Sequence, residues 1–216
     1  MTNKTTICNM ALARIRHNRR VIDADSDTSE EAKMFRVFYD SARDFVLREH
    51  PWGFAKAVKA LSATTNDPPV GWSFEYDYPS DCLFLRAVTG DLGVRSFYGG
   101  QVYGDREFYG VYSPRTSYEV MSRSDADTTV IVCDISPAYA HYTKRVENTE
   151  RFDSSFVNAL AWYLASELAP ALKSDKNDAE KAYKMFRTTI MQASASTQNE
   201  RKPDKEPDSP SISIRD

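Results

Sequence analysis

Hydrophobic residues recur every three to four positions in four segments of the chain, the spacing that places apolar side chains on one face of an α-helix. These segments are expected to form helices at about 3–17, 28–50, 153–170 and 177–195. The clearest apolar stripe belongs to the second segment and consists of Met34, Phe35, Phe38, Ala42, Phe45 and Val46. Because each helix must bury its apolar face, helices from both ends of the chain are expected to pack together as a bundle.

Local signals predict where these helices begin and end. Thr28 and Glu31 have the spacing of a capping box at the start of the second helix. Pro51 is expected to stop that helix, because the residue before a proline is disfavoured in the α conformation. Asp153 is a good N-cap for the third helix, and Pro170 is expected to end or kink it.

Between the helical segments, apolar and polar residues alternate, which is the pattern of β-strands. Phe74, Tyr76 and Tyr78 are expected to point to the same side of the first strand. All eight glycines lie within 53–110 and 16 of the 26 aromatic residues lie within 52–142, which favours turns and strands in this region. The expected strands are 72–79, 81–88, 117–121, 129–135 and 138–146.

Two further segments are expected to lie outside the core. Residues 90–116 are rich in Gly, Tyr, Ser and Arg, which predicts a protruding loop or hairpin. Residues 199–216 carry three prolines and nine charges, which predicts a disordered, mobile arm. The predicted fold class is therefore α+β, with an antiparallel helical bundle from both termini (1–50 and 150–198), a β-rich middle domain (51–149) and the flexible C-terminal arm.

Composition and charge exclude several classes of protein. A chain that is 41% hydrophobic and 27% charged is neither disordered throughout nor fibrous, and a net charge of −3 argues against a general binder of polyanions. Cys8, Cys82 and Cys133 are too far apart for a disulfide scaffold or a zinc motif. With neither a signal-peptide pattern nor a long apolar run, the chain is expected to be soluble, made in the cytoplasm and free of membrane partners.

Motifs of catalysis are not found in the sequence, which contains no nucleophile elbow, zinc-protease helix, P-loop or dinucleotide fingerprint. A Cys–His pair could be assembled from Cys82 or Cys133 with His50 or His141. Both cysteines lie in apolar strand segments, however, where a buried and inert thiol is the usual finding. We therefore predict no catalytic residue, no cofactor and no metal ligand.

Carboxylates leave one enzymatic alternative open. A glycan hydrolase needs two carboxyl groups across a cleft, and Glu75, Asp77 and Asp81 lie close together in the sequence. Pro79, Ser80 and Asp81 have the composition of a turn, which favours a turn-forming role for Asp77 or Asp81. A cell-wall glycan hydrolase that uses these carboxylates is kept as an alternative function.

The most basic window of the chain contains Arg14, Arg16, Arg19 and Arg20. Such a cluster could bind phosphates, which keeps a nucleic-acid-binding module as a second alternative. It also follows the first predicted helix, where cations interact favourably with the negative end of the helix dipole. The helix-end explanation is favoured. Binding to an acidic partner surface is compatible with both explanations, so the four arginines are candidate partner-binding residues.

The C-terminal arm supplies four further candidate partner-binding residues, Arg201, Lys202, Ile212 and Ile214. Apolar and polar residues alternate from Ser211 to Ile214 within a charged segment. Such a segment could become ordered on a partner, either by adding a strand or by inserting the two isoleucines into pockets. The alternative is a terminus without a binding role.

Four segments together resemble the tail tubular protein A, or head-to-tail adaptor, family of short-tailed bacteriophages. They are NMALARI, SEEAKMFRVFYDSARDFVLREHPWGFAKAVKALS, YDYPSDCLFLRAV and FDSSFVNALAWYLASELAPAL. Their order and spacing extend over roughly residues 5–195, although each motif alone would be weak. The sequence departs from the family pattern in the segment 90–116 and in the arm, so contact residues there cannot be transferred from the family.

The resemblance implies a structural virion protein rather than an enzyme. A member of this family would bind beneath the portal protein as a ring of twelve copies at the head–tail junction. The ring would form part of a channel for double-stranded DNA, which would pass without sequence-specific binding, and a platform for the tail nozzle or tail spike protein. Such a protein would support genome retention and ejection, and would be made in the host cytoplasm.

Overall fold

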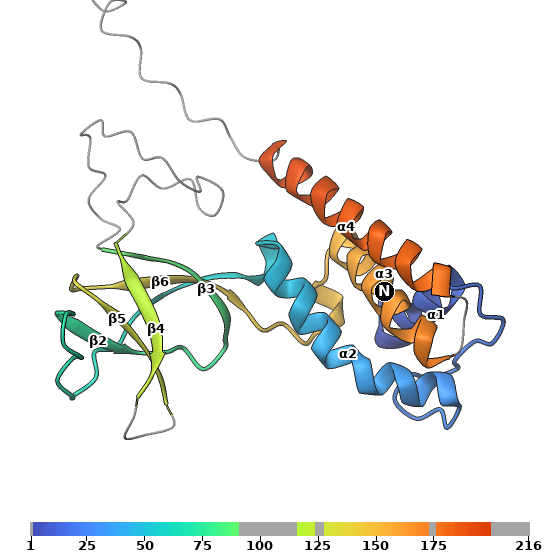
Figure 1. Cartoon of the computed structure of the whole chain (residues 1–216), viewed down its shortest axis with the longest axis horizontal. Helices are drawn as coiled ribbons and strands as arrows, with labels where there is room; N and C mark the ends of the chain where they lie inside the picture. The colour runs from blue at the N-terminus through green and yellow to red at the C-terminus, as the bar shows by residue number, and fades with distance from the viewer. Residues whose placement is uncertain (1, 91–115, 124–127, 173–175, 200–216) are drawn as a thin grey trace, which may run out of the picture.

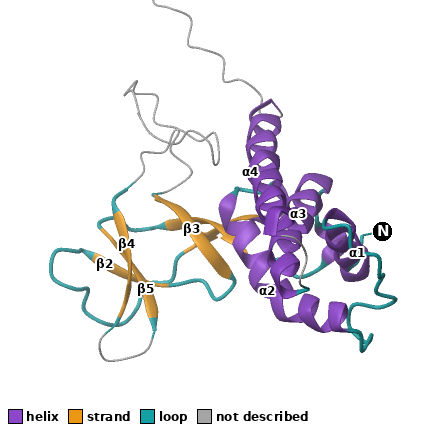
Figure 2. Ribbon diagram, turned by 45° about the vertical axis from the view of Figure 1, so that its right-hand side comes forward, coloured by secondary structure: helices purple, strands orange, loops and turns teal. Residues whose placement is uncertain are grey.

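The computed structural model describes residues 2–90, 116–123, 128–172 and 176–199. These residues form a mixed α+β structure, with the helices packed together at one end and two small antiparallel sheets at the other (Figures 1 and 2). The α-helices are α1 (Lys4–Arg14), α2 (Glu30–Glu49), α3 (Ser154–Ala171) and α4 (Lys176–Asn199). The strands are β1 (Lys56–Ala60), β2 (Phe74–Asp77), β3 (Cys82–Thr89), β4 (Tyr118–Ser122), β5 (Thr129–Cys133) and β6 (Tyr139–Lys144). The 3-10 helices Gly53–Ala55 and Thr149–Arg151 lie where the chain passes between the two ends.

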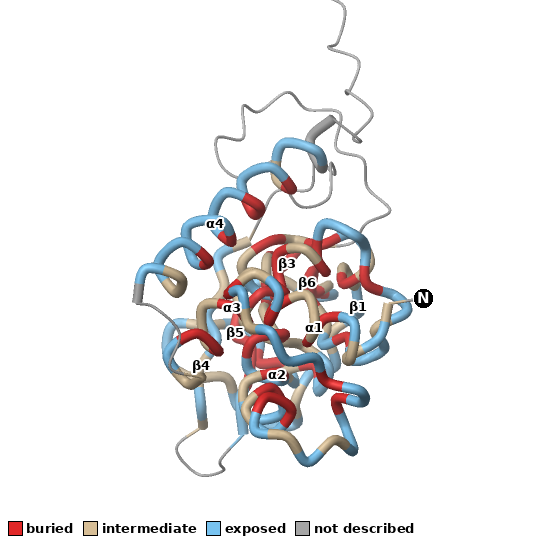
Figure 3. Tube along the Cα trace, turned by 90° about the vertical axis from the view of Figure 1, so that its right-hand side faces the viewer, coloured by how far each residue is buried: buried red, intermediate tan, exposed pale blue. Residues whose placement is uncertain are grey.

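Helix α3 is the centre of the bundle, because it packs against α1, α2 and α4. It is apolar on most of its circumference, which is what a helix surrounded by others requires. Helix α4, by contrast, is buried along one side only, and Figure 3 shows exposed positions along its outer side. The buried residues of α3 are Phe156, Val157, Ala159, Leu160, Ala161, Leu164, Ala165, Leu168 and Ala169.

The N-terminus of α2 corrects one sequence prediction. The N-cap is Ser29 rather than Thr28, and its hydroxyl accepts a hydrogen bond from the amide of Ala32 at 3.4 Å. The cause is Asp27, whose carboxylate accepts the amide of Ser29 at 2.8 Å and holds the chain in a turn up to that point. Glu31 does not close a capping box, because its carboxylate contacts a histidine of the preceding loop.

The predicted ends of α3 agree closely with the structure, whereas the C-terminus of α1 does not. Asp153 caps α3 by accepting the amide of Phe156, and Pro170 lies in the last turn of that helix. Helix α1 ends at Arg14, earlier than predicted, because Arg16 adopts a left-handed conformation with φ of 55°. The amide of His17 then bonds to the carbonyl of Leu12 at 3.0 Å, which closes a Schellman-type cap.

Trp52 anchors the chain where it leaves α2 for the β region. Its indole Nε1 donates a 2.8 Å hydrogen bond to the carbonyl of Val46, and its ring packs edge-on against Phe156 at 5.2 Å between centroids. The ring of His50 also packs edge-on against the indole, at 4.7 Å between centroids. The sequence motif at 50–52 is therefore a helix end with an aromatic anchor in the bundle core.

The strands of the described chain form two three-stranded antiparallel sheets, ordered β1-β6-β3 and β2-β5-β4. All five predicted strands are present: β2, β5 and β6 are shorter than predicted, and β3 and β4 keep their predicted lengths but begin one residue later. Strand β1 is an additional strand that the sequence analysis missed. Apolar residues from both sheets form a second core, separate from that of the bundle. Its buried members are Tyr76, Leu85, Val88, Ile131, Cys133, Ala138, Ala140 and Tyr142.

Two predictions lie largely outside the described residues. The segment 91–115 contains nearly all of the predicted Gly/Tyr-rich loop, and residues 200–216 contain the predicted arm together with its four candidate residues, Arg201, Lys202, Ile212 and Ile214. Asn199 belongs to α4, which extends four residues beyond its predicted end. Among the described helices none combines the length and the apolar character that spanning a membrane would need.

Candidate partner-binding surfaces

Arg14 at the end of α1 and Arg16 just after it each contact another helix. One guanidinium nitrogen of Arg14 donates to the carbonyl of Asn158 at 2.9 Å, and the group lies 4.2 Å from the ring centroid of Trp162. Burial lowers the pKa of Arg14 to about 10, so it is still charged at neutral pH. Arg16 forms an exposed ion pair with Asp178 of α4 at 3.0 Å. Arg14 is therefore a packing residue, whereas Arg16 stays accessible.

The remaining residues of the basic window approach α2. His17 Nε2 lies 3.0 Å from one carboxylate oxygen of Glu31, and Arg19 lies 3.9 Å from the other. Burial alone would raise the pKa of Glu31, but its contacts with His17 and Arg19 outweigh that effect and lower the pKa. Arg20 is exposed. Of the four predicted arginines, Arg16, Arg19 and Arg20 thus present accessible charge, and Arg14 does not.

The three carboxylates of the hydrolase alternative do not face one another across a cleft. Glu75 is buried, forms an ion pair with Arg123 at 3.0 Å and accepts the hydroxyl of Thr64 at 2.8 Å. Asp81 accepts the hydroxyl of Tyr142 at 2.9 Å and lies in the turn before β3. Asp77 is exposed at the end of β2. Two of the three therefore stabilise the β region directly.

The cysteine thiols are held in their protonated form. Burial raises the pKa of Cys8 to about 12, and burial also raises the pKa values of Cys82 and Cys133. The thiol of Cys82 contacts the Tyr78 hydroxyl at 3.1 Å, whereas the ring of His141 contacts the hydroxyl of Thr89 at 2.9 Å. In the described part of the chain, no group of three or more His, Cys, Asp or Glu residues could hold a metal ion.

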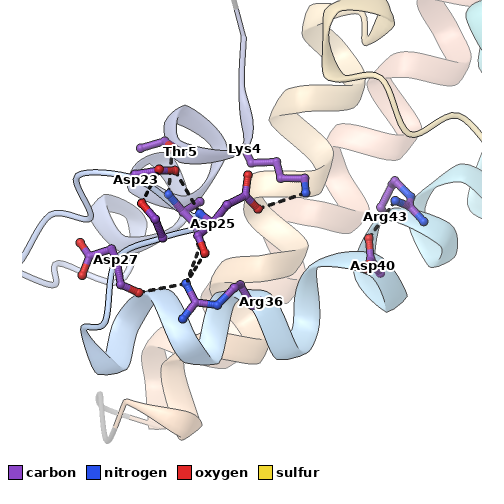
Figure 4. A network of polar contacts seen from close by, with 10 residues as sticks. Lys4, Thr5, Asp23, Asp25, Asp27, Arg36, Asp40 and Arg43 are labelled. Carbon is purple, nitrogen blue, oxygen red and sulfur yellow. Dashed lines mark hydrogen bonds and ion pairs between the residues drawn. The ribbon is translucent and has the colours of Figure 1, made fainter.

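A loop between α1 and α2, residues 21–29, carries three aspartates and is here called the acidic loop. Figure 4 shows how side chains of both helices immobilise it. The guanidinium of Arg36 donates to the carbonyls of Ala24 and Asp27 at 2.8 and 3.0 Å, and Lys4 pairs with Asp25 at 3.2 Å. The hydroxyl of Thr5 accepts the amide of Ala24 at 3.0 Å. The loop is therefore rigidly attached to the bundle.

Within the acidic loop, Ile22 is 91% exposed although the residues around it are fixed. The amide and carbonyl of the preceding residue, Val21, both bond to the side chain of Asn9 at 2.9 Å. The amide of Ile22 itself donates to Asp27 at 3.1 Å. Hydrogen bonds to the carboxylates, from Ser26 on Asp23 and from Ser29 on Asp27, lower their pKa values, so both are charged at neutral pH.

A groove of about 630 Å³ lies between the C-terminal half of α2 and the start of β3, and is here called the arginine groove. Its lining residues are Ser41, Asp44, Phe45, Arg48, Glu49, Leu83, Phe84 and Arg145. The guanidinium of Arg48 lies 5.2 Å from the centroid of Phe84, and that of Arg86 lies 4.3 Å from it. Arg145 pairs with Asp44 at 3.0 Å and is about half exposed. The groove therefore combines apolar side chains with charged groups of both signs, since Asp44 and Glu49 line it beside Arg48 and Arg145.

Sequence reasoning did not identify either surface. The acidic loop has a recognisable signal, since the alternation of aspartate with small residues before a helix is visible in the sequence. The arginine groove has none, because its residues come from 41–49, 83–84 and 145 and meet only after the chain folds.

Comparisons with known proteins give no family assignment. No protein-family model matches the chain, and no curated protein matches it. The resemblance to the adaptor family therefore stays a prediction, and the function is argued from the motifs and surfaces of the chain itself.

Proposed function

We propose that the chain is a non-enzymatic adaptor of a bacteriophage virion, which binds beneath the portal as a ring and links head to tail. The observation that carries the proposal is the structural use of every motif behind the resemblance. The motif at 50–52 ends a helix and anchors an indole, and the motif at 79–82 forms the turn that leads into β3. Motifs that serve packing rather than catalysis are expected in a protein whose role is assembly.

Two different surfaces at the ends of α2 also support an assembly role. The acidic loop precedes the N-terminus of α2, and the arginine groove lies along its C-terminal half. A subunit with different contact surfaces at its two ends suits a closed ring, whose neighbours meet through unlike faces. The net charge of −3 is compatible with a channel in which DNA slides, since each neutralised phosphate would add affinity.

Binding to the portal tests the proposal directly. Purified protein is sedimented alone and with the portal ring encoded by the same genome, and the native mass of each peak is measured. The expected result is co-sedimentation in a fixed ratio of one adaptor chain per portal chain. Protein that stays unbound over the whole range of salt and pH in which the portal is intact would contradict the adaptor function.

Deletion of residues 200–216 separates the role of the arm from that of the body. If the arm docks on the portal, the truncated chain is expected to lose portal binding while its helical circular dichroism stays unchanged. Unchanged portal binding would remove the arm from the contact and leave the adaptor function standing. The full-length chain carried through the same preparation is the control.

Two assays address the alternatives. A turbidity assay on bacterial cell walls is expected to show no clearing, because Glu75 is buried in an ion pair and cannot reach a polymer. A DNA probe at physiological salt is expected to show no shift, because Arg14 is engaged within the bundle and the exposed Arg16 and Arg19 each lie beside a carboxylate that would repel phosphates. Clearing or a salt-dependent shift would favour the corresponding alternative.

A further inference from the structure

Strand β4 has an edge that the rest of its sheet leaves open. The amide of Arg123 donates to the carbonyl of Thr128 at 3.0 Å, in continuation of the register between β4 and β5. Hydrogen-bonded and non-hydrogen-bonded pairs alternate along an antiparallel ladder, so the backbone groups of Val120 and Ser122 face away from β5. Within the described chain, no hydrogen bond reaches these outward groups.

The opposite edge of the same sheet is covered. The amide of Thr64 donates to the carbonyl of Glu75 at 3.0 Å, and the amide of Asp77 donates to the carbonyl of Ser62 at 2.9 Å. Segment 62–64 thus bonds the outer edge of β2, whereas β4 stays open on its outer side. An open edge is a template for a further strand, and extended peptides bind many sheets in this way.

The side chains of β4 define what kind of strand would fit beside it. Val120 is 41% exposed and lies opposite Ile131 of the second core, so it extends the apolar face of the sheet to its edge. The neighbouring Glu119 points to the other face and is exposed. A matching strand therefore carries an apolar side chain opposite Val120 and a positive charge opposite Glu119.

The C-terminal arm contains a sequence that fits this edge. Residues 211–215 read Ser-Ile-Ser-Ile-Arg, so an extended chain would place both isoleucines on one side and Arg215 on the other. If Ile214 lies opposite Val120 in an antiparallel pair, Arg215 lies opposite Glu119. This register places apolar side chains beside each other and opposite charges beside each other.

A proline distinguishes this register from the next one. In the register just described, Ile212 lies opposite Ser122, and its amide can donate to the outward carbonyl there. A shift by two residues would place Pro210 opposite Ser122, and proline has no amide hydrogen to donate. Strand β1, at the edge of the other sheet, carries the exposed Lys59 instead of a glutamate, which would repel Arg215.

The direction of the strands favours the arm of another copy. An antiparallel strand must enter at the Ser122 end of β4. Figures 1 and 2 show this end at the bottom of the view, whereas α4 ends at the top, on the side where β4 begins. The arm of the same chain would have to pass along the whole β region and then turn back. A neighbouring copy can supply the arm without this detour.

We propose that residues 211–215 of one copy add as an antiparallel strand to the open edge of β4 in the next copy, with Ile214 beside Val120 and Arg215 beside Glu119. This inference deepens the proposed ring and rests on it for its biological setting. The contact is heterologous, since an arm meets a sheet edge, so a copy whose arm is engaged still offers its edge. Repetition of such a contact closes into a ring when the rotation between copies allows it.

Disulfide formation between two singly substituted chains tests the pairing. In the proposed register Ser213 lies opposite Met121, in a non-hydrogen-bonded pair whose Cα atoms would be about 4.5 Å apart, which suits a disulfide. Met121→Cys and Ser213→Cys chains are mixed, oxidised gently and separated by mass without reductant. Lys59→Cys, at an exposed position on the edge strand β1, replaces Met121→Cys in the matched control. Wild-type protein run alongside measures the background from the three native thiols.

The expected result is a two-chain product from Met121→Cys with Ser213→Cys, well above that from Lys59→Cys with Ser213→Cys. A chain that carries both substitutions, at 121 and at 213, is expected to give a ladder of linked copies. Equal products from the two mixtures, or a doubly substituted chain that closes only on itself, would overturn the proposal. The same conclusion follows if Met121→Cys chains link equally well to one another, or if no product forms at any concentration, which would leave the edge to another protein.

Charge reversal tests the pairing of the side chains. Self-association measured by sedimentation is expected to weaken about fivefold in Arg215→Glu, and to recover when Glu119→Arg is added to the same chain. Arg201→Glu, in the arm but outside the paired segment, is the control and is expected to change association little. If Arg215→Glu and Arg201→Glu behave alike, or if Glu119→Arg does not restore association, the proposed pairing is wrong.

The portal separates this inference from the function on which it rests. If the chain binds the portal but gives no specific disulfide between arm and β4, the adaptor function stands and the contact fails. If the disulfide-linked copies form but do not bind the portal, the contact stands and the adaptor function fails.

Discussion

The helical bundle and the β region bury their apolar side chains on different scales. In the described chain the core of the bundle contains 30 buried residues, whereas the core between the two sheets contains eight. Each region of the described chain also buries four polar or charged side chains, so these form a much larger share of the buried residues in the β region, where Glu75 pairs with Arg123. The comparison indicates that the bundle is stabilised mainly by close packing, and that the β region depends more on a few directional contacts.

The same comparison extends to the two proposed contact surfaces. The acidic loop is bonded entirely to the bundle, through α1 and α2. The arginine groove combines α2 with β3 and with Arg145 after β6, so its shape depends on how the β region sits against the bundle. Changes in the β region are therefore expected to affect the groove and leave the loop intact.

The largest expected effect comes from breaking the packing of the bundle. Phe156 in α3 is fully buried and contacts Trp52, Phe54 and Phe152, so Phe156→Ala is expected to cost about 3–5 kcal/mol in the free energy of unfolding. This loss is measured by urea unfolding, monitored through the circular dichroism of the helices. Val37→Ala, on the exposed side of α2, should stay within about 0.5 kcal/mol of wild type. A loss below about 1 kcal/mol for Phe156→Ala would contradict the packing account.

The next effect should be confined to the β region. Glu75→Gln removes the charge that pairs with Arg123 but keeps an acceptor for Thr64, so a loss of about 2–3 kcal/mol is expected. Hydrogen exchange is expected to speed up in β2, β4 and β5 while the amides of α3 stay protected. Glu119→Gln, at an exposed position on β4, serves as the control. Equal acceleration in bundle and β region would show that the two parts unfold together.

A smaller loss of stability is expected when the N-cap of α3 is removed. Asp153→Ala removes the acceptor of the Phe156 amide and is expected to cost about 1 kcal/mol. Asp153→Asn retains an acceptor and should recover most of that loss. The measurement is again urea unfolding, and identical stabilities for the two variants would mean that the carboxylate acts other than as a cap.

The smallest effect concerns a tyrosine whose hydroxyl is buried in the bundle. Among the described residues the hydroxyl of Tyr39 has no hydrogen-bond partner, so Tyr39→Phe is expected to be neutral or slightly stabilising at pH 7. Burial raises the pKa of Tyr39 to about 12, so the folded state binds more protons than the unfolded state between pH 10 and 12. Wild-type stability should therefore fall as pH rises through this window.

Tyr39→Phe removes this contribution, so the variant should exceed wild type by about 1 kcal/mol more at pH 10.5 than at pH 7. Unfolding free energies at the two pH values measure the difference. A pH dependence that is the same in both proteins would show that the Tyr39 hydroxyl is hydrated in the folded state.

The helices could be predicted from the sequence because their signals are local. The stripe of α2 and the N-cap at Asp153 depend only on residues within a few positions of one another. Ser29 displaced Thr28 as the cap because Asp27 bonds to its amide, a competition between neighbouring side chains that spacing alone does not resolve. The sequence pattern thus predicts the first residue of a helix to within a residue or two.

The β region and the surfaces were harder to predict because they depend on distant residues. Strand β1 has the sequence KAVKA, which shows little apolar alternation, and it is defined by pairing with β6, from Lys56 with Thr143 to Ala60 with Tyr139. The arginine groove likewise unites α2 with Phe84 and Arg145. Such features are set by tertiary packing, which a single sequence does not display.

The central position of α3 has a consequence for synthesis on the ribosome. Helices α1 and α2 are translated first, but the helix that covers their apolar faces ends only at Ala171. At about 5–20 residues per second, roughly 6–24 s separate the completion of α2 from that of α3. The nascent chain therefore exposes its N-terminal helices throughout translation of the β region, and the last helices to emerge close the molecule.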